Sequence, residues 1–328
     1  TEHKFSQGHD FEEYVKKLYP DSLDLNGLGF KENLEKTKEA VKNKKTIFEA
    51  SFMIDNLFVR SDLIIPQGDS WDLIEIKSTT QSKPQHIPDL AFQKYVLEKA
   101  GLKVNKCFLI YLNKEYVKNG EIDPKELTVQ EEVTEKVNSF TDIESHIPKF
   151  IEVMNASEYK DIPIGQHCNK PYECPLKKEC WGTLPENNVL QLTNWRIYWK
   201  LFNKGVQDIK DIPEGTKLAA KDEVLIKSLE HNPYISKEHI KHFLGLLNYP
   251  LYHFDYETFD TAVPLFDQSK PYQKIAFQYS LHIEQKDGSV EHKEFLAEGN
   301  EDPRPAMLEQ MKTDLEGTGD IVAFNKSF

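Results

Sequence analysis

The stretch WDLIEIKSTTQ, residues 71–81, combines an apolar strand with two charged side chains. Ile74 and Ile76 point to one face of an extended strand, because alternate residues share a face. Glu75 and Lys77, also two residues apart, share the opposite face. A carboxylate and an ammonium in this position form either a surface ion pair or half of an active site. The neighbouring residues must decide between these interpretations.

Asp62 ends the preceding predicted strand, FVRSD, and completes a set of two carboxylates and one lysine. Divalent metal ions prefer hard oxygen ligands, which Asp62, Glu75 and the carbonyl of Ile76 can supply. The metal would polarise a phosphate and lower the pKa of an attacking water. Lys77 would orient that water or stabilise the developing charge. These residues therefore predict hydrolysis of a phosphodiester with Mg²⁺ or Mn²⁺.

The order of these residues, an Asp, twelve intervening residues and then Glu-x-Lys, resembles the active site of the PD-(D/E)xK nucleases. The resemblance is strongest to the RecB-like branch, which includes CRISPR-associated exonucleases. It implies that Asp62 and Glu75 are metal ligands and that Lys77 is the catalytic lysine. Gln93, on the helix predicted after the site, matches that branch's helical glutamine, but the tyrosine expected four residues later is Leu97 here.

The same resemblance implies a role for Glu12, which lies four residues after Gly8 on the first predicted helix. Related enzymes keep a histidine or a glutamate at this place. The alternatives are that Glu12 belongs to the solvated face of its helix and that Gln93 caps or braces a neighbouring loop.

The loop HCNKPYECPLKKECW places Cys168, Cys174 and Cys180 at two equal spacings of six residues. Three thiolates that converge in a loop with little apolar content are typical of a metal site. The trio resembles the cysteines that close the domain of CRISPR-associated and AddB-type RecB-like nucleases. There they bind a [4Fe-4S] cluster together with a fourth cysteine near the N terminus. This chain has no cysteine before Cys107, so we expect the fourth ligand upstream of Thr1 or a cluster that has been lost.

Other interpretations of the cysteines stay open. Zinc with His167 as a fourth ligand is geometrically awkward, because His167 adjoins Cys168. Ordinary free thiols are the remaining alternative. Cys107, within the apolar stretch KCFLIYL, is expected to be a small core residue.

A second pair of acidic residues lies far downstream, in YHFDYETF. Asp255 and Glu257 are two residues apart on one face of an apolar strand, an arrangement that can hold metal ions. The pair resembles the first motif of DnaQ-like 3'-5' exonucleases, and IVAFNKSF resembles their second motif, with Asn325 and Phe328 in place. The next acidic residue of that family and its third motif are not in this chain. The alternative is an acidic pair near a turn.

The pattern as a whole predicts an α/β protein with three parts. Residues 1–183 are predicted to contain a PD-(D/E)xK, restriction-endonuclease-like core with a helix, three strands, a helix and a strand, followed by the cysteine loop. The first two of these strands are expected on either side of an Asp55-Asn56 turn. Residues 184–247 are predicted as a helical connector. Residues 248–328 are predicted as the N-terminal part of an incomplete RNase H-like domain.

Composition limits the classes of function. The 328 residues carry a net charge of −13 and a mean hydropathy of −0.60, without a long apolar run, so no membrane span is expected. Four cysteines in so long a chain favour a cytoplasmic protein. The acidic balance argues against non-specific attraction to polyanions, although a local basic groove or bound metal would still hold a nucleic acid. Because the chain opens at Thr1 and stops at Phe328 within an apolar pattern, we expect a piece of a longer protein.

These observations predict a metal-dependent nuclease, with DNA as the favoured partner and cleavage at Asp62, Glu75 and Lys77. The order of motifs resembles that of uncharacterised bacterial proteins that join a RecB-like nuclease to a DnaQ-like exonuclease domain. The alternatives are a nucleic-acid binding or scaffold protein whose nuclease folds do not cut, and a dedicated ribonuclease.

Overall fold

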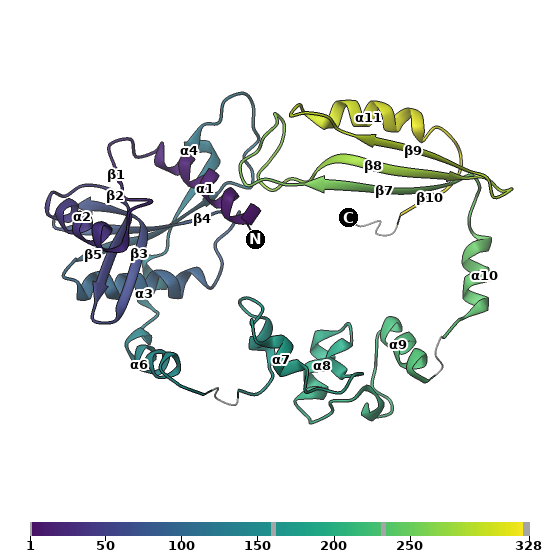
Figure 1. Cartoon of the computed structure of the whole chain (residues 1–328), viewed down its shortest axis with the longest axis horizontal. Coiled ribbons are helices and arrows are strands. Elements are labelled where there is room, and N and C mark those ends of the chain that lie inside the picture. Colours follow the sequence, from purple (N-terminus) through teal and green to yellow (C-terminus); the bar gives the residue numbers. More distant parts are fainter. Residues whose placement is uncertain (1, 159–161, 231–233, 324–328) are drawn as a thin grey trace. The chain divides into compact units, whose positions relative to one another are not determined.

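The computed structural model describes residues 2–158, 162–230 and 234–323. Contacts divide the chain into two compact units, Thr1–Asn155 with Asn248–Phe328, and Ala156–Leu247. The first unit contains two β-sheets, and the described part of the second consists of helices and loops (Figure 1). The protein is therefore mixed α/β, as the sequence predicted.

The larger sheet has six strands in the order β1-β2-β3-β4-β5-β6. Strands β2, β3 and β4 are antiparallel neighbours, β4 and β5 are parallel, and β6 returns antiparallel to β5. A short β1 lies parallel to β2 at the other edge. The six strands, in order, are Leu23–Asp24, Ile47–Ile54, Leu57–Gln67, Ser70–Lys77, Val104–Leu112 and Thr128–Glu132.

Local signals explain the connections that hold this sheet together. β2 and β3 form a hairpin around the predicted Asp55-Asn56 turn, where Asp55 adopts φ +49°. Parallel strands need a crossover, and α3 (His86–Lys99) supplies it between β4 and β5. The chain leaves α3 through Gly101 at φ +94°, a conformation that favours glycine.

Consecutive residues of a strand point to opposite faces of the sheet. An apolar cluster lies against each face of the six-stranded sheet. Ile64 of β3 lies in the cluster that contains residues of α2 (Phe30–Lys42) and α3. Leu63 lies in the opposite cluster, which contains Phe11 of α1 (Glu2–Lys16). The candidate residues at the ends of β3 and β4 are thus positioned by a sheet with a core on each side.

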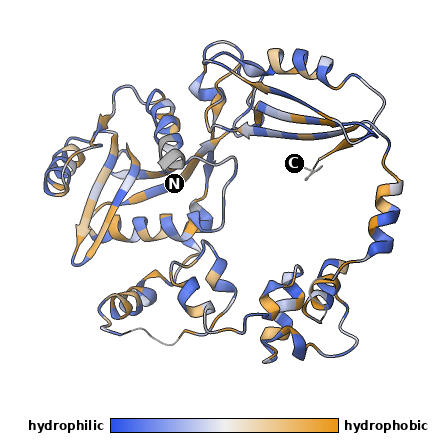
Figure 2. Ribbon diagram, turned by 45° about the vertical axis from the view of Figure 1, so that its right-hand side comes forward, coloured by the Kyte–Doolittle hydropathy of each residue, from blue (hydrophilic) through white to orange (hydrophobic). Residues whose placement is uncertain are grey.

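The smaller sheet has the order β10-β7-β8-β9. β7 pairs antiparallel with β8, β8 antiparallel with β9, and β10 parallel with β7. α11 packs on one face, where Tyr279 and Met307 are buried. The strands of this sheet carry both hydrophobic and hydrophilic bands along their length (Figure 2). The elements are β7 Leu251–Phe259, β8 Ile275–Glu284, β9 Val290–Leu296, α11 Pro303–Asp314 and β10 Ile321–Val322.

The second unit is built around a small apolar core that includes Val189, Trp199 and Ile209. The unit contains both the cysteine loop and residues 184–247, which were predicted as a connector, and its described part is mainly helical. The helices are α7 Lys177–Trp181, α8 Trp195–Phe202, α9 Ala220–Glu230 and α10 Lys237–Gly245.

The structure differs from the sequence-based expectation in a few elements. The apolar spacing within residues 8–20 predicts a helix that ends at Pro20, whereas α1 spans Glu2–Lys16. β6 was not predicted, because TVQEE is a polar edge strand that is held by backbone pairing with β5 rather than by an apolar pattern. Helices α5 (Thr134–Asn138) and α6 (Ile143–Met154) follow it. The described helices include none with the length and apolar character that crossing a bilayer would require.

Candidate active site

The carboxylates of Asp62 and Glu75 meet where β3 and β4 separate. The antiparallel ladder between these strands ends with Leu63 opposite Ile74, so Asp62 and Glu75 lie directly beyond the last pair. The amide of Ile76 donates a hydrogen bond to Oδ2 of Asp62, at 2.7 Å. The strand end therefore replaces a ladder hydrogen bond with a contact to a carboxylate.

Lys77 and Gln93 both bind Glu75. Nζ of Lys77 contacts Oε1 of Glu75, and Nε2 of Gln93 donates to Oε2 at 2.6 Å. Glu75 and Gln93 are buried, with 4% and 5% of their surface exposed. The structure thus brings Asp62, Glu75, Lys77 and Gln93 into one cluster at the end of the sheet.

Asp89 belongs to the same cluster and was missed by the sequence analysis. Its Oδ2 lies 3.2 Å from Nζ of Lys77, and its Oδ1 accepts from Nε2 of Gln93 at 3.3 Å. The signal was available, because Asp89 precedes Gln93 by four residues and shares its face of α3.

Burial dominates the electrostatics of the cluster. It raises the pKa of Asp62 well above the ordinary value, and the charge of Glu75 adds to this effect. Burial also raises the pKa of Glu75, against the opposing effect of Lys77. For Lys77, burial alone would lower the pKa, but Glu75 and the other nearby carboxylates raise it above its usual range. One buried and one half-buried carboxylate with a single lysine thus favour the binding of further positive charge.

Glu12 extends this acidic region from α1. Its Oε1 lies 3.3 Å from Nζ of Lys16, which also binds Asp24 at 2.8 Å. The pKa of Glu49 is raised by burial and then by the charge of Glu12. Glu12 is therefore linked to the cluster through Glu49, and no hydrogen bond or ion pair between Glu12 and Asp62 is seen within the described residues.

Glu49 is a second residue that the sequence analysis missed. Phe48 and Ala50 both pair with β3, which places Glu49 across from Asp62 in the strand register. Glu49 has φ +58°, which is uncommon for residues other than glycine and interrupts the pairing at this point. Its charge also contributes to the raised pKa of Asp62. A lone carboxylate within the apolar stretch TIFEASF was the available signal.

The chemistry of the cluster fits a hard divalent cation. Mg²⁺ usually binds through one or two carboxylates and keeps several waters. Asp62 and Glu75 provide two such groups, and the pKa of each is raised by burial. Oε1 of Gln93 is buried without a hydrogen-bond partner among the described residues. No group of three or more His, Cys, Asp or Glu in the described part is arranged to hold a metal. A cation here would therefore rely on backbone oxygens and water for its remaining ligands.

The three loop cysteines lie in different environments. Cys168 is buried, Cys174 is half-buried and Cys180 is exposed. The amide of Cys174 donates to the carbonyl of Cys168 at 2.9 Å, which joins the first two along the backbone. Within the described residues these side chains do not form a metal-binding group. Cys107 is fully buried, as expected for a core residue, and burial raises its pKa to about 12.

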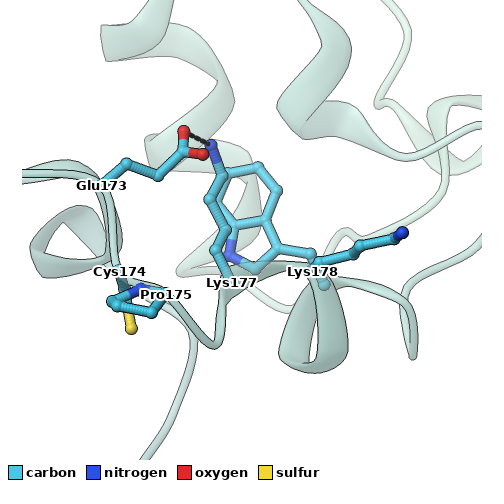
Figure 3. Close-up of a pocket in the computed structure, with 6 residues that line it drawn as sticks. Glu173, Cys174, Pro175, Lys177 and Lys178 are labelled. Carbon is cyan, nitrogen blue, oxygen red and sulfur yellow. Dashed lines mark hydrogen bonds and ion pairs between the residues drawn. The ribbon is translucent and has the colours of Figure 1, made fainter. Parts of the chain in front are cut away.

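A shallow hollow of about 380 Å³ lies beside Cys174 (Figure 3). Nζ of Lys177 is 2.7 Å from Oε2 of Glu173 and 4.5 Å from the centre of the Trp181 ring. The Cys174 sulfur points away from this pair in the figure. The hollow is thus formed by an ion pair over an indole, and it belongs to the second unit rather than to the carboxylate cluster.

Asp255 and Glu257 lie together on the face of β7 opposite α11. Their cross-strand neighbours on β8 are Ser280 and Gln278, and both carboxylates are exposed. The intervening Tyr256 packs toward the core of the smaller sheet. The counterparts in the second predicted motif, Asn325 and Phe328, lie outside the described residues.

Comparisons with known proteins connect the chain to a domain and to one relative. Residues 252–328 match the family described as "Domain of unknown function (DUF2779)". The chain is 26% identical over 268 residues to "Uncharacterized protein UU173" of Ureaplasma parvum serovar 3 (strain ATCC 700970), which covers 73% of this chain and 37% of the relative. This chain therefore spans well under half of that relative's length. No solved structure matches this chain. The comparisons thus show a C-terminal part similar to DUF2779 and a distant similarity to the Ureaplasma protein.

Proposed function

We propose that this protein is a metal-dependent nuclease that hydrolyses phosphodiester bonds, with DNA as the favoured substrate. The observation that carries the proposal is the cluster of Asp62, Glu75 and Lys77 at the separated ends of two neighbouring strands. One buried and one half-buried carboxylate with a single lysine attract a divalent cation and leave an ammonium beside it.

Asp62 and Glu75 are the proposed metal ligands. A bound Mg²⁺ or Mn²⁺ would polarise the phosphate and lower the pKa of an attacking water. Lys77, held in its charged form by neighbouring carboxylates, donates to the phosphate oxygens or orients the water. Gln93 orients the carboxylate of Glu75, and Asp89 holds the ammonium from the helix side.

The arrangement of the sheets supports the family assignments that the sequence suggested. The hairpin that carries Asp62, the following Glu75 strand, the crossover helix with Gln93 and the parallel strand resemble a PD-(D/E)xK core. In the smaller sheet, three antiparallel strands and a parallel fourth strand resemble the first half of an RNase H-like fold. We therefore extend the proposal to a DnaQ-like body at residues 248–328, with Asp255 and Glu257 as metal ligands.

One observation favours the alternative of a nucleic-acid binding or scaffold protein. Leu97, at the place of the expected tyrosine, is fully buried in the apolar core and contributes no polar group to the site. In that case the acidic cluster would bind metal without cleavage. A ribonuclease is the third candidate, and its chemistry would use the same cluster.

We also propose that Cys168, Cys174 and Cys180 ligate a [4Fe-4S] cluster together with a cysteine outside this chain. The support is their regular spacing and the backbone hydrogen bond that holds Cys174 to Cys168.

The test is cleavage of end-labelled DNA and RNA of identical sequence with Mg²⁺, with Mn²⁺ and with a chelator. Lys77→Ala should lower the rate by at least about 100-fold, while circular dichroism stays unchanged. Lys94→Ala is the matched control, because Lys94 lies on α3 and forms a surface ion pair with Glu98. Wild-type cleavage by Lys77→Ala would overturn the proposal. Metal binding without cleavage of either substrate would favour the scaffold alternative.

A further inference from the structure

The loop between β7 and β8, residues 260–274, packs on the six-stranded sheet within the first unit. Ala262 and Val263 are buried in the same apolar cluster as Phe11 and Ile74. The side chain of Gln7 on α1 also donates to the carbonyl of Asp260 at 3.0 Å. A segment of the DUF2779-like part thus completes the core behind the strand that carries Glu75 and Lys77.

Tyr272 brings this loop to the candidate active site. Its hydroxyl donates to the carbonyl of Ser78 at 2.7 Å and lies 2.8 Å from Oγ of the same residue. The backbone of Tyr272 has φ +57°, an uncommon conformation for an aromatic residue. Its amide donates to the carbonyl of Thr261 at 2.8 Å, which closes the loop in this conformation.

The bound residue, Ser78, directly follows Lys77. Lys77 is the last residue of β4 and pairs with Tyr111 of β5 on one side. The backbone ladder with β3 has already ended at Ile74, and the side chain of Asp62 continues the contact with β3 as far as the amide of Ile76. Tyr272 therefore contacts the residue that directly follows Lys77, where backbone pairing holds the strand from the β5 side.

The rest of the loop is attached independently of the Tyr272 hydroxyl. Oδ1 of Asp267 accepts from Nζ of Lys118 at 2.7 Å and from the amide of Gly120 at 3.0 Å. The amide of Lys118 also donates to the carbonyl of Ser269 at 3.0 Å. Removal of the hydroxyl alone should therefore leave the loop in place.

We propose that Tyr272 is a positioning residue for Lys77, supplied to the first site by the DUF2779-like segment. The inference rests on the proposed nuclease function of Asp62, Glu75 and Lys77 and adds to it a second requirement. The Tyr272 hydroxyl holds the Ser78 peptide, which sets the direction of the Lys77 side chain toward Glu75 and the phosphate. Cleavage at the first site then depends on the second sheet's loop, although Tyr272 touches neither metal nor substrate.

The test compares Tyr272→Phe with Asp267→Asn in the full chain, in the same DNA cleavage assay. Tyr272→Phe should lower kcat by about tenfold, with unchanged KM and unchanged melting temperature. Asp267→Asn weakens loop attachment without touching Ser78, and it should leave kcat near the wild-type value. Equal losses of kcat in both variants would show that only general loop attachment matters, and would overturn the proposal.

Hydrogen exchange gives a readout that does not depend on activity. Amides of residues 78–80 should exchange faster in Tyr272→Phe than in the wild type, with exchange in β2 unchanged as the internal control. Unchanged exchange at 78–80 would overturn the positioning role even if kcat fell. Lys77→Ala in the same assay separates the two proposals: if it cleaves like the wild type, the proposed function fails, and hydrogen exchange alone then decides the role of Tyr272.

Discussion

Nε2 of Gln93 donates to Oε2 of Glu75 at 2.6 Å, and both side chains are buried. A helix residue thus orients a carboxylate on the neighbouring strand β4. Such outer contacts hold a ligand in one direction and commonly matter almost as much as the ligand itself. Removing such a contact should therefore weaken metal binding more than it destabilises the fold.

We expect Gln93→Met to weaken the apparent affinity for Mn²⁺ in cleavage by about 10- to 100-fold. Methionine keeps the volume of the buried side chain but cannot orient the Glu75 carboxylate. The measurement is the Mn²⁺ concentration that gives half of the maximal rate. Gln130→Met, at an exposed position of β6, is the control. A Gln93→Met variant with a wild-type Mn²⁺ dependence would contradict the assigned role.

Asp62→Asn should stabilise the metal-free protein at pH 8 while it abolishes cleavage. The raised pKa means that folded Asp62 keeps its proton to higher pH than unfolded Asp62 does. Stability is therefore lost as pH rises from the unfolded value toward the folded one, by about 1.4 kcal/mol for each unit of pKa difference. Asparagine removes this loss and still accepts from the Ile76 amide.

The check is urea unfolding at pH 5 and pH 8, with and without Mg²⁺. Added Mg²⁺ should stabilise the wild type more at pH 8 and should have little effect on Asp62→Asn, because the cation binds the ionised folded state. Asp69→Asn, in the exposed turn between β3 and β4, is the control. A variant that is less stable than the wild type at pH 8 would refute the expected sign.

Asp314→Ala should lower the free energy of unfolding by about 2 kcal/mol. Asp314 is buried and accepts from the Tyr279 hydroxyl at 2.6 Å and from Gln310 at 3.1 Å. Although burial alone would raise its pKa, these hydrogen bonds and Lys293 lower it below the ordinary value. The contribution should be present above the unfolded pKa of Asp314 and disappear as pH falls through the folded one.

Unfolding at pH 7 and at pH 3 measures this contribution. The difference between Asp314→Ala and the wild type should shrink at the lower pH. Asp287→Ala, at the exposed turn between β8 and β9, is the matched control on the same sheet. A difference that stays constant with pH would show that packing, rather than the ionised carboxylate, stabilises this sheet.

Cys168→Ser and Cys180→Ser should each remove iron and sulfide from protein that also has the fourth cysteine ligand available. A cluster needs every thiolate ligand, so a single oxygen substitution should abolish or greatly weaken binding. Anaerobic purification with iron, sulfide and visible-absorption analysis measures this. Cys107→Ser is the control, because this thiol is buried in the core of the six-stranded sheet. Zinc in place of iron, or no metal in the wild type, would overturn the cluster proposal.

Asp255→Ala should leave cleavage by this chain unchanged. The described residues gather no third acidic, cysteine or histidine ligand around Asp255 and Glu257, and both lie on an exposed face of β7. A two-metal site needs more carboxylates than these two to hold both ions. The assay is 3'-5' trimming in a Lys77→Ala background. Trimming that disappears with Asp255→Ala would show that the visible pair is sufficient.

The amino-acid sequence by itself determined the local relationships in the candidate site. Glu75 and Lys77 share a face because strand side chains alternate with a period of two. The Asp55-Asn56 turn predicted the hairpin that carries Asp62, and the structure confirms that hairpin. The helix with Gln93, closed by Gly101, and the following apolar strand were also predicted from the sequence. The catalytic roles of these residues stay predictions.

Only the tertiary structure decided which distant residues join the site. The ladder between β3 and β4 ends just before Asp62, which depends on the register of the whole sheet and not on local pattern. Asp89 reaches the site because α3 packs beside β4. Glu49 lies near Asp62 because the pairing of β2 with β3 is interrupted at this residue. Tyr272 reaches Ser78 across 194 positions of sequence, because a loop of the second sheet buries its apolar residues against the first. The hydrophobic effect is non-directional, so the spacing of residues in the sequence does not indicate which distant segment will cover an apolar face.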